Sequence, residues 1–447
     1  MDIIGKLYKM FRESAGVTTD SRTIKGGEMF FALKGENFDG NEYALKALES
    51  GAAYAVVDEG TPVSEAKDER IVPVENTLKA LKELAAFHRN SVMVEGRRLT
   101  VIGLTGTNGK TTTKELIRSV LSVKYNVTAT EGNLNNEIGV PLSVLKINDA
   151  TQLAVIEMGA SHPGDINSLV EVSQPDFGII TNVGKGHLLG FGSLDGVRKT
   201  KGELYDYISR TGGSVFLNED LPYLREMAQE RGIDNVIPYG VKYDGATVLP
   251  MTADRPCLSM EIPLNCTSSL LLHTHLVGAY NADNVMTAIA VGRHFGVPVE
   301  EALKAIESYI PANSRSQMQK TDSNTLIVDA YNANPVSMKA ALRSLDALVA
   351  EHKAVMLGDM LELGADSVAE HKAIVYCVSE MNLDKIFLVG EEFRKALDSC
   401  GSECERISWF ADSASLAEHL SKERISGCTV LIKGSRGVRM ERVSSSL

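Results

Sequence analysis

Cysteine is scarce in this chain of 447 residues, with six scattered copies and no Cys-x-x-Cys pair. Cys400 and Cys404 lie four residues apart, but no second pair completes a zinc site. Scattered free thiols are typical of proteins in a reducing compartment. The chain also lacks an apolar run of the roughly 18 residues that a membrane span needs, and its first segment, MDIIGKLYKMF, is too short and polar for a signal peptide. We therefore expect a cytosolic protein with no membrane insertion.

Positive charge is also in deficit, since 46 basic residues stand against 58 acidic ones and give a net charge of −12. That balance disfavours nucleic acid as a partner, because nonspecific binding needs a basic face. Small phosphorylated ligands stay compatible with it, since a few local cations are enough to hold them. Internal repeats and low-complexity tracts are absent as well, and at about 100–200 residues per domain the length predicts two to four globular domains.

Three regions of different pattern follow one another. Residues 1–97 hold short apolar pieces at 29–33 and 52–58 and a helical pattern at 77–89, which predicts a small α/β domain. Residues 98–310 contain LTVIGLTG, LAVIEMG and FGIITNVG, three apolar runs that end in glycine and alternate with helical patterns. This alternation predicts a doubly wound sheet. Positions 241–280 lack a helical period and are expected to form an antiparallel β portion.

Residues 311–447 repeat the strand–helix alternation. TLIVDAY, KAVMLGD, KIFLVG and CTVLIKG alternate with helical patterns near 335–348, 367–380 and 413–423. The predicted fold class is therefore α/β with three domains: a small N-terminal α/β domain, a central P-loop doubly wound domain and a C-terminal Rossmann-like domain.

The segment GLTGTNGKTTT lies between an apolar strand and a helix, which is the context of a phosphate-binding loop. Lys110 would neutralise the β- and γ-phosphates, and the Thr111 hydroxyl would ligate Mg²⁺. The strict pattern G-x-x-x-x-G-K-[ST] fails at Leu104, and the alternative is an ordinary glycine-rich turn. The residues predicted to hold the phosphates are Gly106, Thr107, Asn108, Gly109, Lys110, Thr111 and Thr112.

This loop resembles the ATP loop of the Mur ligases and of the related folylpolyglutamate and cyanophycin synthetases. The segments TNVGKGH, KTKGEL, DAYNANPVSM and GDMLELG extend the resemblance, which runs from about residue 19 to 437. The last two segments are typical of members that add D-alanyl-D-alanine to UDP-N-acetylmuramoyl-tripeptide. The alternatives are a sibling Mur or folylpolyglutamate-type ligase that adds one amino acid, a nucleotide-binding scaffold with an inactive ligase core, and a P-loop kinase.

The resemblance implies an ATP-dependent, amide-bond-forming ligase that works through an acyl phosphate. The products would be UDP-N-acetylmuramoyl-pentapeptide, ADP and phosphate, made in the last cytoplasmic step of peptidoglycan precursor assembly. It implies that residues 1–97 bind the UDP-sugar, 98–310 bind ATP and 311–447 bind the incoming D-alanyl-D-alanine. We expect a monomer.

Beside Thr111, three residues are candidates for metal ligation. Glu157 ends an apolar strand at the carboxyl edge of the predicted sheet, where a carboxylate suits Mg²⁺, although a capping or salt-bridged glutamate is the alternative. By the resemblance, His187 ligates a second Mg²⁺ and Lys201 is carbamylated. An ammonium would repel the metal, whereas a carbamate offers anionic oxygen ligands. Without the resemblance, His187 would be a structural histidine and Lys201 a solvated surface lysine.

The remaining candidates bind nucleotide or substrate by the resemblance. Arg315 and Asp329 would close over ATP from the third domain, with Arg315 stabilising the transferring phosphoryl group, and Asn284 belongs to the adenine-contacting segment. From the residues alone, Arg315 would be a surface arginine, and Asn135 and Asn136 would be ordinary turn residues. For Asp359 and Glu362 the alternative is a helix-start cap. The predicted substrate residues are Ser21 and Arg22 for UDP, Asn135 and Asn136 near the phosphates and sugar-peptide, and Tyr331, Asn332, Asn334, Asp359 and Glu362 for the dipeptide.

Overall fold

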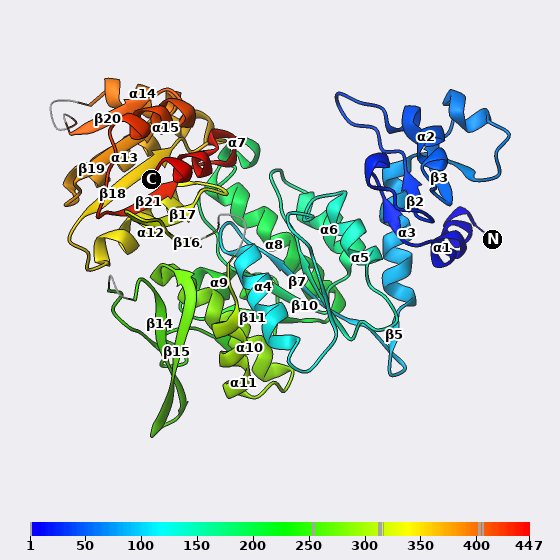
Figure 1. Cartoon of the computed structure of the whole chain (residues 1–447). Coiled ribbons are helices and arrows are strands. Elements are labelled where there is room, and N and C mark those ends of the chain that lie inside the picture. Colours follow the sequence, from blue (N-terminus) through cyan, green and yellow to red (C-terminus); the bar gives the residue numbers. More distant parts are fainter. Residues whose placement is uncertain (1, 253–254, 312–314, 316, 401–403, 405) are drawn as a thin grey trace.

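The computed structural model describes residues 2–252, 255–311, 315, 317–400, 404 and 406–447. Three sheets follow one another along the chain, and each forms the centre of its own α/β unit (Figure 1). The first and third units lie on opposite sides of the central one, which agrees with the predicted three-domain α/β class. None of the described helices is long and apolar enough to cross a membrane.

The first unit is a four-stranded parallel sheet with helices packed against it. Its strands are β1 (Val17–Thr18), β2 (Met29–Phe31), β3 (Tyr54–Asp58) and β4 (Ile71–Val74), in spatial order 1-2-3-4. Its helices are α1 (Ile3–Glu13), α2 (Ala44–Glu49) and α3 (Thr77–Ser91). The predicted helix at 77–89 is confirmed as α3, which begins where the Asn76 side chain accepts a hydrogen bond from Lys79 N.

The central sheet has six parallel strands in the order β12-β11-β10-β7-β9-β8. They are β7 (Thr100–Thr105), β8 (Val127–Ala129), β9 (Leu153–Glu157), β10 (Phe177–Ile180), β11 (Ser214–Asn218) and β12 (Val236–Tyr239). The chain runs to one side of β7 through β8 and β9 and then crosses to β10 on the other side. This makes the carboxyl end of β7 a topological switch point, the place where open α/β sheets bind ligands.

Helices cover both faces of this sheet. They are α4 (Lys110–Leu121), α5 (Gly139–Leu145), α6 (Asp165–Ser173), α7 (Leu188–Phe191), α8 (Leu194–Thr211), α9 (Pro222–Gln229), α10 (Ala282–His294) and α11 (Val299–Ser308). The predicted antiparallel portion is confirmed as β13 (Thr247–Val248), β14 (Cys257–Asn265) and β15 (Ser268–Val277). These strands extend the apolar core on the α4 side of the central sheet.

The third sheet has the order β16-β17-β21-β18-β19-β20. Its strands are β16 (Gln317–Lys320), β17 (Thr325–Asp329), β18 (Lys353–Gly358), β19 (Lys385–Val389), β20 (Ile407–Phe410) and β21 (Thr429–Lys433), and its helices α12 (Pro335–Ala347), α13 (Ser367–Glu380), α14 (Glu391–Asp398) and α15 (Ser413–Lys422). β16 pairs antiparallel with β17, and the other pairs are parallel. The predicted parallel unit therefore gains one antiparallel edge strand, which the polar sequence QMQK did not indicate.

The first unit is packed firmly onto the central one. A single apolar core runs from α1 and α3 into the central sheet and its helices α5, α6 and α8. A short hairpin, β5 (Met93–Val94) with β6 (Arg97–Arg98), lies between the two units. The boundaries placed after residues 97 and 310 stay predictions.

Candidate active site

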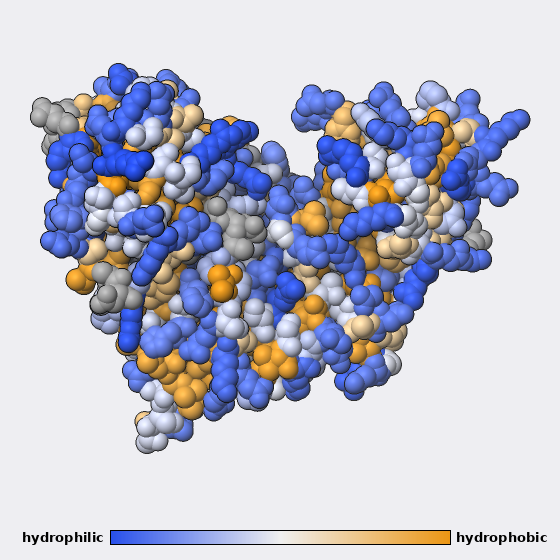
Figure 2. Space-filling model, in the orientation of Figure 1, coloured by the Kyte–Doolittle hydropathy of each residue, from blue (hydrophilic) through white to orange (hydrophobic). Residues whose placement is uncertain are grey.

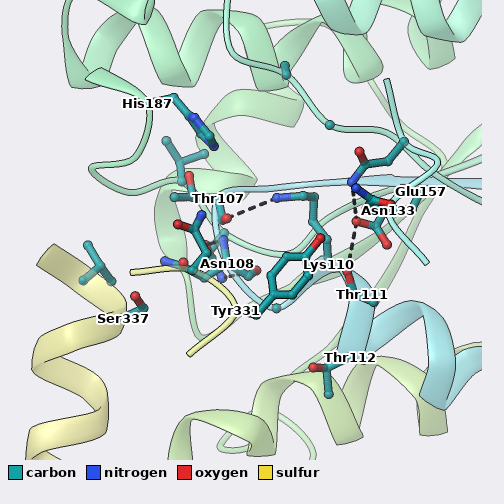
Figure 3. Close-up of a pocket in the computed structure, with 18 of the residues that line it drawn as sticks. Thr107, Asn108, Lys110, Thr111, Thr112, Asn133, Glu157, His187, Tyr331 and Ser337 are labelled. Carbon is teal, nitrogen blue, oxygen red and sulfur yellow. Dashed lines mark hydrogen bonds between the residues drawn. The ribbon is translucent and has the colours of Figure 1, made fainter. Parts of the chain in front are cut away.

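A cavity of about 900 Å³ opens at the carboxyl ends of the central strands and is closed on one side by the third unit. Figure 2 shows the surface hollowed between the first and third units, above the central one. The cavity walls come from the phosphate loop, the ends of β9 and β10 and the segment after β17 (Figure 3). Its volume is that of a site for a small-molecule ligand. The predicted residues in the lining are Thr107, Asn108, Gly109, Lys110, Thr111, Thr112, Asn135, Asn136, Glu157, His187, Asn284, Arg315, Asp329, Tyr331 and Asn332.

The phosphate loop joins β7 to α4 as the sequence predicts. Gly109 has a left-handed backbone, φ 80°, immediately before α4 begins at Lys110. A Cβ at Gly109 would lie 2.6 Å from Asn284 Oδ1, so the close packing here requires glycine. Gly106 is packed as closely against Thr181. The loop thus brings the start of α4 to the cavity, as anion binding requires, while Thr107 N and Asn108 N donate to Asn182 at 3.0 Å each.

Lys110 lies at the base of this loop. Its Nζ donates to Gly106 O at 2.7 Å and to Thr107 O at 3.1 Å, so the ammonium group faces the loop's own carbonyls (Figure 3). Burial lowers the pKa of Lys110, and the nearby Glu157 carboxylate opposes that effect. Lys110 also belongs to the cavity lining.

Glu157 and Thr111 form the part of the site that fits a metal ion. Glu157 is 1% exposed, and its Oε1 accepts hydrogen bonds from Thr111 Oγ1 at 3.1 Å and Asn135 Nδ2 at 2.8 Å. Its Oε2 is buried with no hydrogen-bond partner in the described part of the chain. A buried carboxylate oxygen without a donor is costly unless a cation binds it. A lone carboxylate with a hydroxyl, completed by phosphate oxygens and water, is a typical Mg²⁺ set.

His187 and Lys201 are the candidates for a second metal ion, and His187 lies away from Glu157 and Thr111 (Figure 3). His187 has a left-handed backbone, φ 52°, and its Nδ1 contacts Glu362 of the third unit. Lys201 on α8 is 2% exposed, and its Nζ lies 5.5 Å from the centre of the Phe191 ring. Burial lowers the pKa of Lys201 well below its ordinary value, and the charge of Lys110 adds to the effect. The solvated surface lysine that the residue pattern suggested is therefore wrong. In the described residues, no three His, Cys, Asp or Glu side chains gather as a metal cluster.

The third unit contributes a stacked set of charged and aromatic side chains. The Arg315 guanidinium lies 3.6 Å from the centre of the Tyr331 ring, and that of Arg436 lies 5.1 Å from it. Such stacking holds planar cations in place. Asp329 ends β17 and accepts from the buried Lys433 Nζ at 2.5 Å. Positive charge from the third unit therefore faces the phosphate loop across the cavity.

Asn334 links the third unit directly to the phosphate loop. Its Nδ2 donates to Asn108 Oδ1 at 2.7 Å, and its Oδ1 accepts from Ser337 N at 2.9 Å at the start of α12. Asn334 is thus both the N-cap of α12 and a contact to the loop. Asn332 is close by, where its backbone carbonyl accepts from Lys433 at 3.2 Å.

Three predicted asparagines have structural contacts as well as places in the cavity wall. Asn284 accepts from Thr113 Oγ1 at 3.0 Å and donates to Asn281 at 2.9 Å, which places it beneath the loop. Asn136 Oδ1 accepts from Gly139 N at 2.8 Å at the start of α5. Asn135 holds Glu157, as described above.

Seven predicted residues are not part of the cavity wall: Gly106, Lys201, Asn334, Ser21, Arg22, Asp359 and Glu362. Ser21 and Arg22 are in the first unit, where Arg22 pairs with Asp20 at 2.8 Å. The Asp359 carboxylate is 5% exposed and accepts from Glu392 N and Phe393 N at 3.0 and 2.9 Å, so it caps the start of α14. Burial raises the pKa of Asp359, although these amide hydrogen bonds oppose the shift. The helix-start cap that the sequence left open is the contact observed.

The sequence analysis missed Asn182 and Tyr223. Asn182 follows β10, beside the switch point, and its Oδ1 accepts from Asn108 N at 3.0 Å. Its position at a strand end in TNVGKGH was the available signal. Tyr223 accepts from Val183 N at 3.2 Å, and no pattern in the sequence points to it.

Comparison with known proteins gives the family of this fold and site. Three family descriptions match in order: "Mur ligase family, catalytic domain" at residues 13–89, "Mur ligase middle domain" at 104–292 and "Mur ligase, glutamate ligase domain" at 314–436. The UDP-N-acetylmuramoyl-tripeptide–D-alanyl-D-alanine ligase of Bacillus subtilis is 33% identical over 97% of this chain and 93% of its own.

Solved structures agree with that match. MurF from Acinetobacter baumannii superposes with a TM-score of 0.82 at 29% identity, covering 98% of this chain and 97% of that one. MurF ligase from Thermotoga maritima in complex with ADP gives 0.83 at 26% identity, covering 100% and 98%. The chain therefore belongs to the Mur ligase family. Within the family, these relatives make it a MurF-type member.

Proposed function

We propose that this protein is the ATP-dependent ligase that adds D-alanyl-D-alanine to UDP-N-acetylmuramoyl-tripeptide. The products are UDP-N-acetylmuramoyl-pentapeptide, ADP and phosphate, and the reaction is the last cytoplasmic step of peptidoglycan precursor assembly. The observation that carries the proposal is one cavity that brings together three features: the phosphate loop, the third unit's cations, and a buried Glu157 oxygen that has no hydrogen-bond partner among the described residues. The names of its relatives supply the substrates.

The reaction has two steps. A carboxylate oxygen of the tripeptide attacks the γ-phosphorus of ATP, and the bond to ADP breaks to leave an acyl phosphate. The amine of D-alanyl-D-alanine then attacks the acyl carbon, loses a proton, and phosphate leaves as the amide forms. Two anions must meet in the first step, so their repulsion has to be cancelled by cations.

The residues of the cavity divide this task between them. The loop of residues 106–112 and the start of α4 hold the phosphates, and Lys110 and Arg315 approach them from the central and third units. Thr111 and Glu157 are the residues that would hold Mg²⁺, which supplies charge neutralisation for the transferring phosphoryl group. His187 and a carbamylated Lys201 are our proposed holders of a second Mg²⁺.

The three units take separate substrates in this proposal. The first, with Ser21 and Arg22, binds the UDP moiety, while Asn135 and Asn136 lie between the ATP site and the sugar-peptide. Asn284, beneath the phosphate loop, belongs to the segment that contacts adenine in this proposal, and Asp329 closes on the nucleotide from the third unit. Tyr331, Asn332 and Asn334 border the dipeptide, with Asp359 and Glu362 behind them. The protein acts as a monomer.

One assay tests the proposal against its siblings. The protein is incubated with MgATP and UDP-N-acetylmuramoyl-tripeptide, with either D-alanyl-D-alanine or single amino acids, and phosphate and peptide products are measured. We expect phosphate and pentapeptide in equal amounts with the dipeptide only. Phosphate release without a peptide product, or a product with one added amino acid, contradicts the proposal.

A further inference from the structure

Lys114 on α4 is a buried cation that the proposed reaction does not use. Its side chain has no exposed surface, and its Nζ lies 2.5 Å from Thr130 O and 2.8 Å from Glu115 Oε1. Burying an ammonium group costs free energy, and an apolar side chain of similar volume is often as stabilising. A lysine at this point of the core indicates that its contacts have a use beyond packing.

Thr130 connects Lys114 to the end of β9. It follows β8, and its N–H donates to Val155 O at 3.0 Å. Its Oγ1 accepts from Glu157 N at 3.0 Å, in a buried contact. The same residue therefore receives Lys114 on its carbonyl oxygen and holds the backbone of Glu157 through its hydroxyl.

The connections form a closed ring around the metal-binding pair. Glu157 Oε1 accepts from Thr111 Oγ1, and Thr111 is three residues before Lys114 on α4. Residues three apart in a helix lie on one face, so Thr111 and Lys114 are neighbours there. The ring runs from Lys114 to Thr130, to Glu157, to Thr111 and back along α4. It fixes the first turn of α4 relative to the end of β9.

We propose that Lys114 is a positioning residue that sets the spacing between the Thr111 hydroxyl and the Glu157 carboxylate, and with it the affinity for a divalent cation. Lys114 acts through Thr130 and touches neither substrate nor metal. Residues behind metal ligands typically change metal affinity about 10- to 100-fold when they are replaced. The inference rests on the proposed function, because that function places Mg²⁺ at Thr111 and Glu157.

The test measures Mn²⁺ binding in the presence of ADP. Free Mn²⁺ is quantified by its electron paramagnetic resonance signal. We expect Lys114→Met to bind Mn²⁺ about 10-fold or more weakly, with unchanged ADP affinity in the absence of metal. Arg89→Met is the matched control, because it removes another fully buried cation, one that lies on α3 of the first unit and not in the cavity wall. It is expected to lower the melting temperature and leave Mn²⁺ binding unchanged.

A second pair of variants separates positioning from a general loss of stability. Thr130→Val removes the hydroxyl that holds Glu157 N and is expected to weaken Mn²⁺ binding, whereas Thr130→Ser keeps the hydroxyl and restores it. If Lys114→Met does not fold, this pair decides. A lower melting temperature with wild-type Mn²⁺ affinity in Lys114→Met, or in Thr130→Val, overturns the inference. Wild-type protein that binds no Mn²⁺ with ADP contradicts the proposed function instead.

Discussion

Arg89 on α3 donates to Asp176, in the turn before β10, with 2.9 Å between Nη2 and Oδ2. The Arg89 side chain is fully buried and also donates to the carbonyls of Ser173 and Gln174 at 3.2 and 3.1 Å. Three acceptors in the turn that follows α6 therefore hold one cation of the first unit. Together with the shared apolar core, this contact makes the first and central units one packed body.

Replacing Arg89 by methionine is expected to destabilise the protein. The change leaves the two carbonyls without this donor and removes one of the hydrogen bonds to Asp176. We expect it to cost about 2–3 kcal/mol, below the range for a fully buried pair, because Asp176 is partly exposed and keeps its contact with Arg98. The melting temperature by calorimetry measures the effect. Arg98→Met is the control, since Arg98 binds the same carboxylate from an exposed position and should cost less than about 1 kcal/mol. Equal losses of stability in the two variants would contradict the expectation, because the burial of Arg89 would then add nothing to the cost.

Glu157→Gln is expected to lower kcat on the order of 100-fold or more, because the amide keeps the shape of the side chain but loses the charge that a cation needs. ADP binding without metal should be preserved. Phosphate release, measured against Mg²⁺ concentration, checks both points. Glu131→Gln is the control, as its exposed carboxylate pairs with Lys146 near the same cavity, and it should change kcat less than about 2-fold. A Glu157→Gln enzyme with wild-type Mg²⁺ dependence refutes the assignment.

The proposed carbamylation of Lys201 should depend on pH. A neutral amine reacts with CO₂, and the lowered pKa of Lys201 means that this form is present at lower pH than for an ordinary lysine. After removal of CO₂, reactivation by bicarbonate should therefore rise with pH and level off below the ordinary lysine pKa of 10.5. Lys201→Ala should be inactive, insensitive to bicarbonate and partly rescued by short carboxylates. Full activity in Lys201→Ala removes the carbamate from the mechanism.

The third unit is expected to close on the central one when substrates bind. Lys185 of the central unit donates to Glu370 on α13 at 2.6 Å, and Lys339 of α12 approaches the same carboxylate at 3.5 Å. Glu370→Ala removes this contact, so the ligand-free protein should have a larger radius of gyration than wild type by solution X-ray scattering. With MgADP and UDP-sugar-peptide, the two proteins should converge. Identical scattering in all four conditions argues against a closure step.

The sequence predicted those elements whose structure depends on neighbouring residues in the chain. The strand–glycine–helix order around Lys110 predicts the phosphate loop, and the proline at the start of α12 predicts where that helix begins. Both features depend mainly on the local sequence. Glu157 could be placed at a sheet edge because parallel strands end together. β16 escaped prediction because a polar edge strand has no apolar signal, and α14 because it is short and highly charged.

Contacts between units were beyond reach of the sequence. Nothing in GDMLELG shows that the Asp359 carboxylate accepts hydrogen bonds from the first N–H groups of α14, because that helix begins more than thirty residues later. Likewise, the burial of Lys201 depends on how α8 packs, and the contact of His187 with Glu362 depends on where the third unit sits. The assigned roles of these residues stay predictions, whereas their positions are now described.

The contact between Asn108 and Asn334 joins the phosphate loop of the central unit to the third unit, and both units line the cavity. A compound that fills the cavity must therefore contact both units and hold their arrangement, whatever its affinity for either alone. The apparent affinity of such a compound would fall with the fraction of molecules in which the two units are docked. Variants that weaken docking would therefore become resistant to it, although none of the atoms that it contacts has changed.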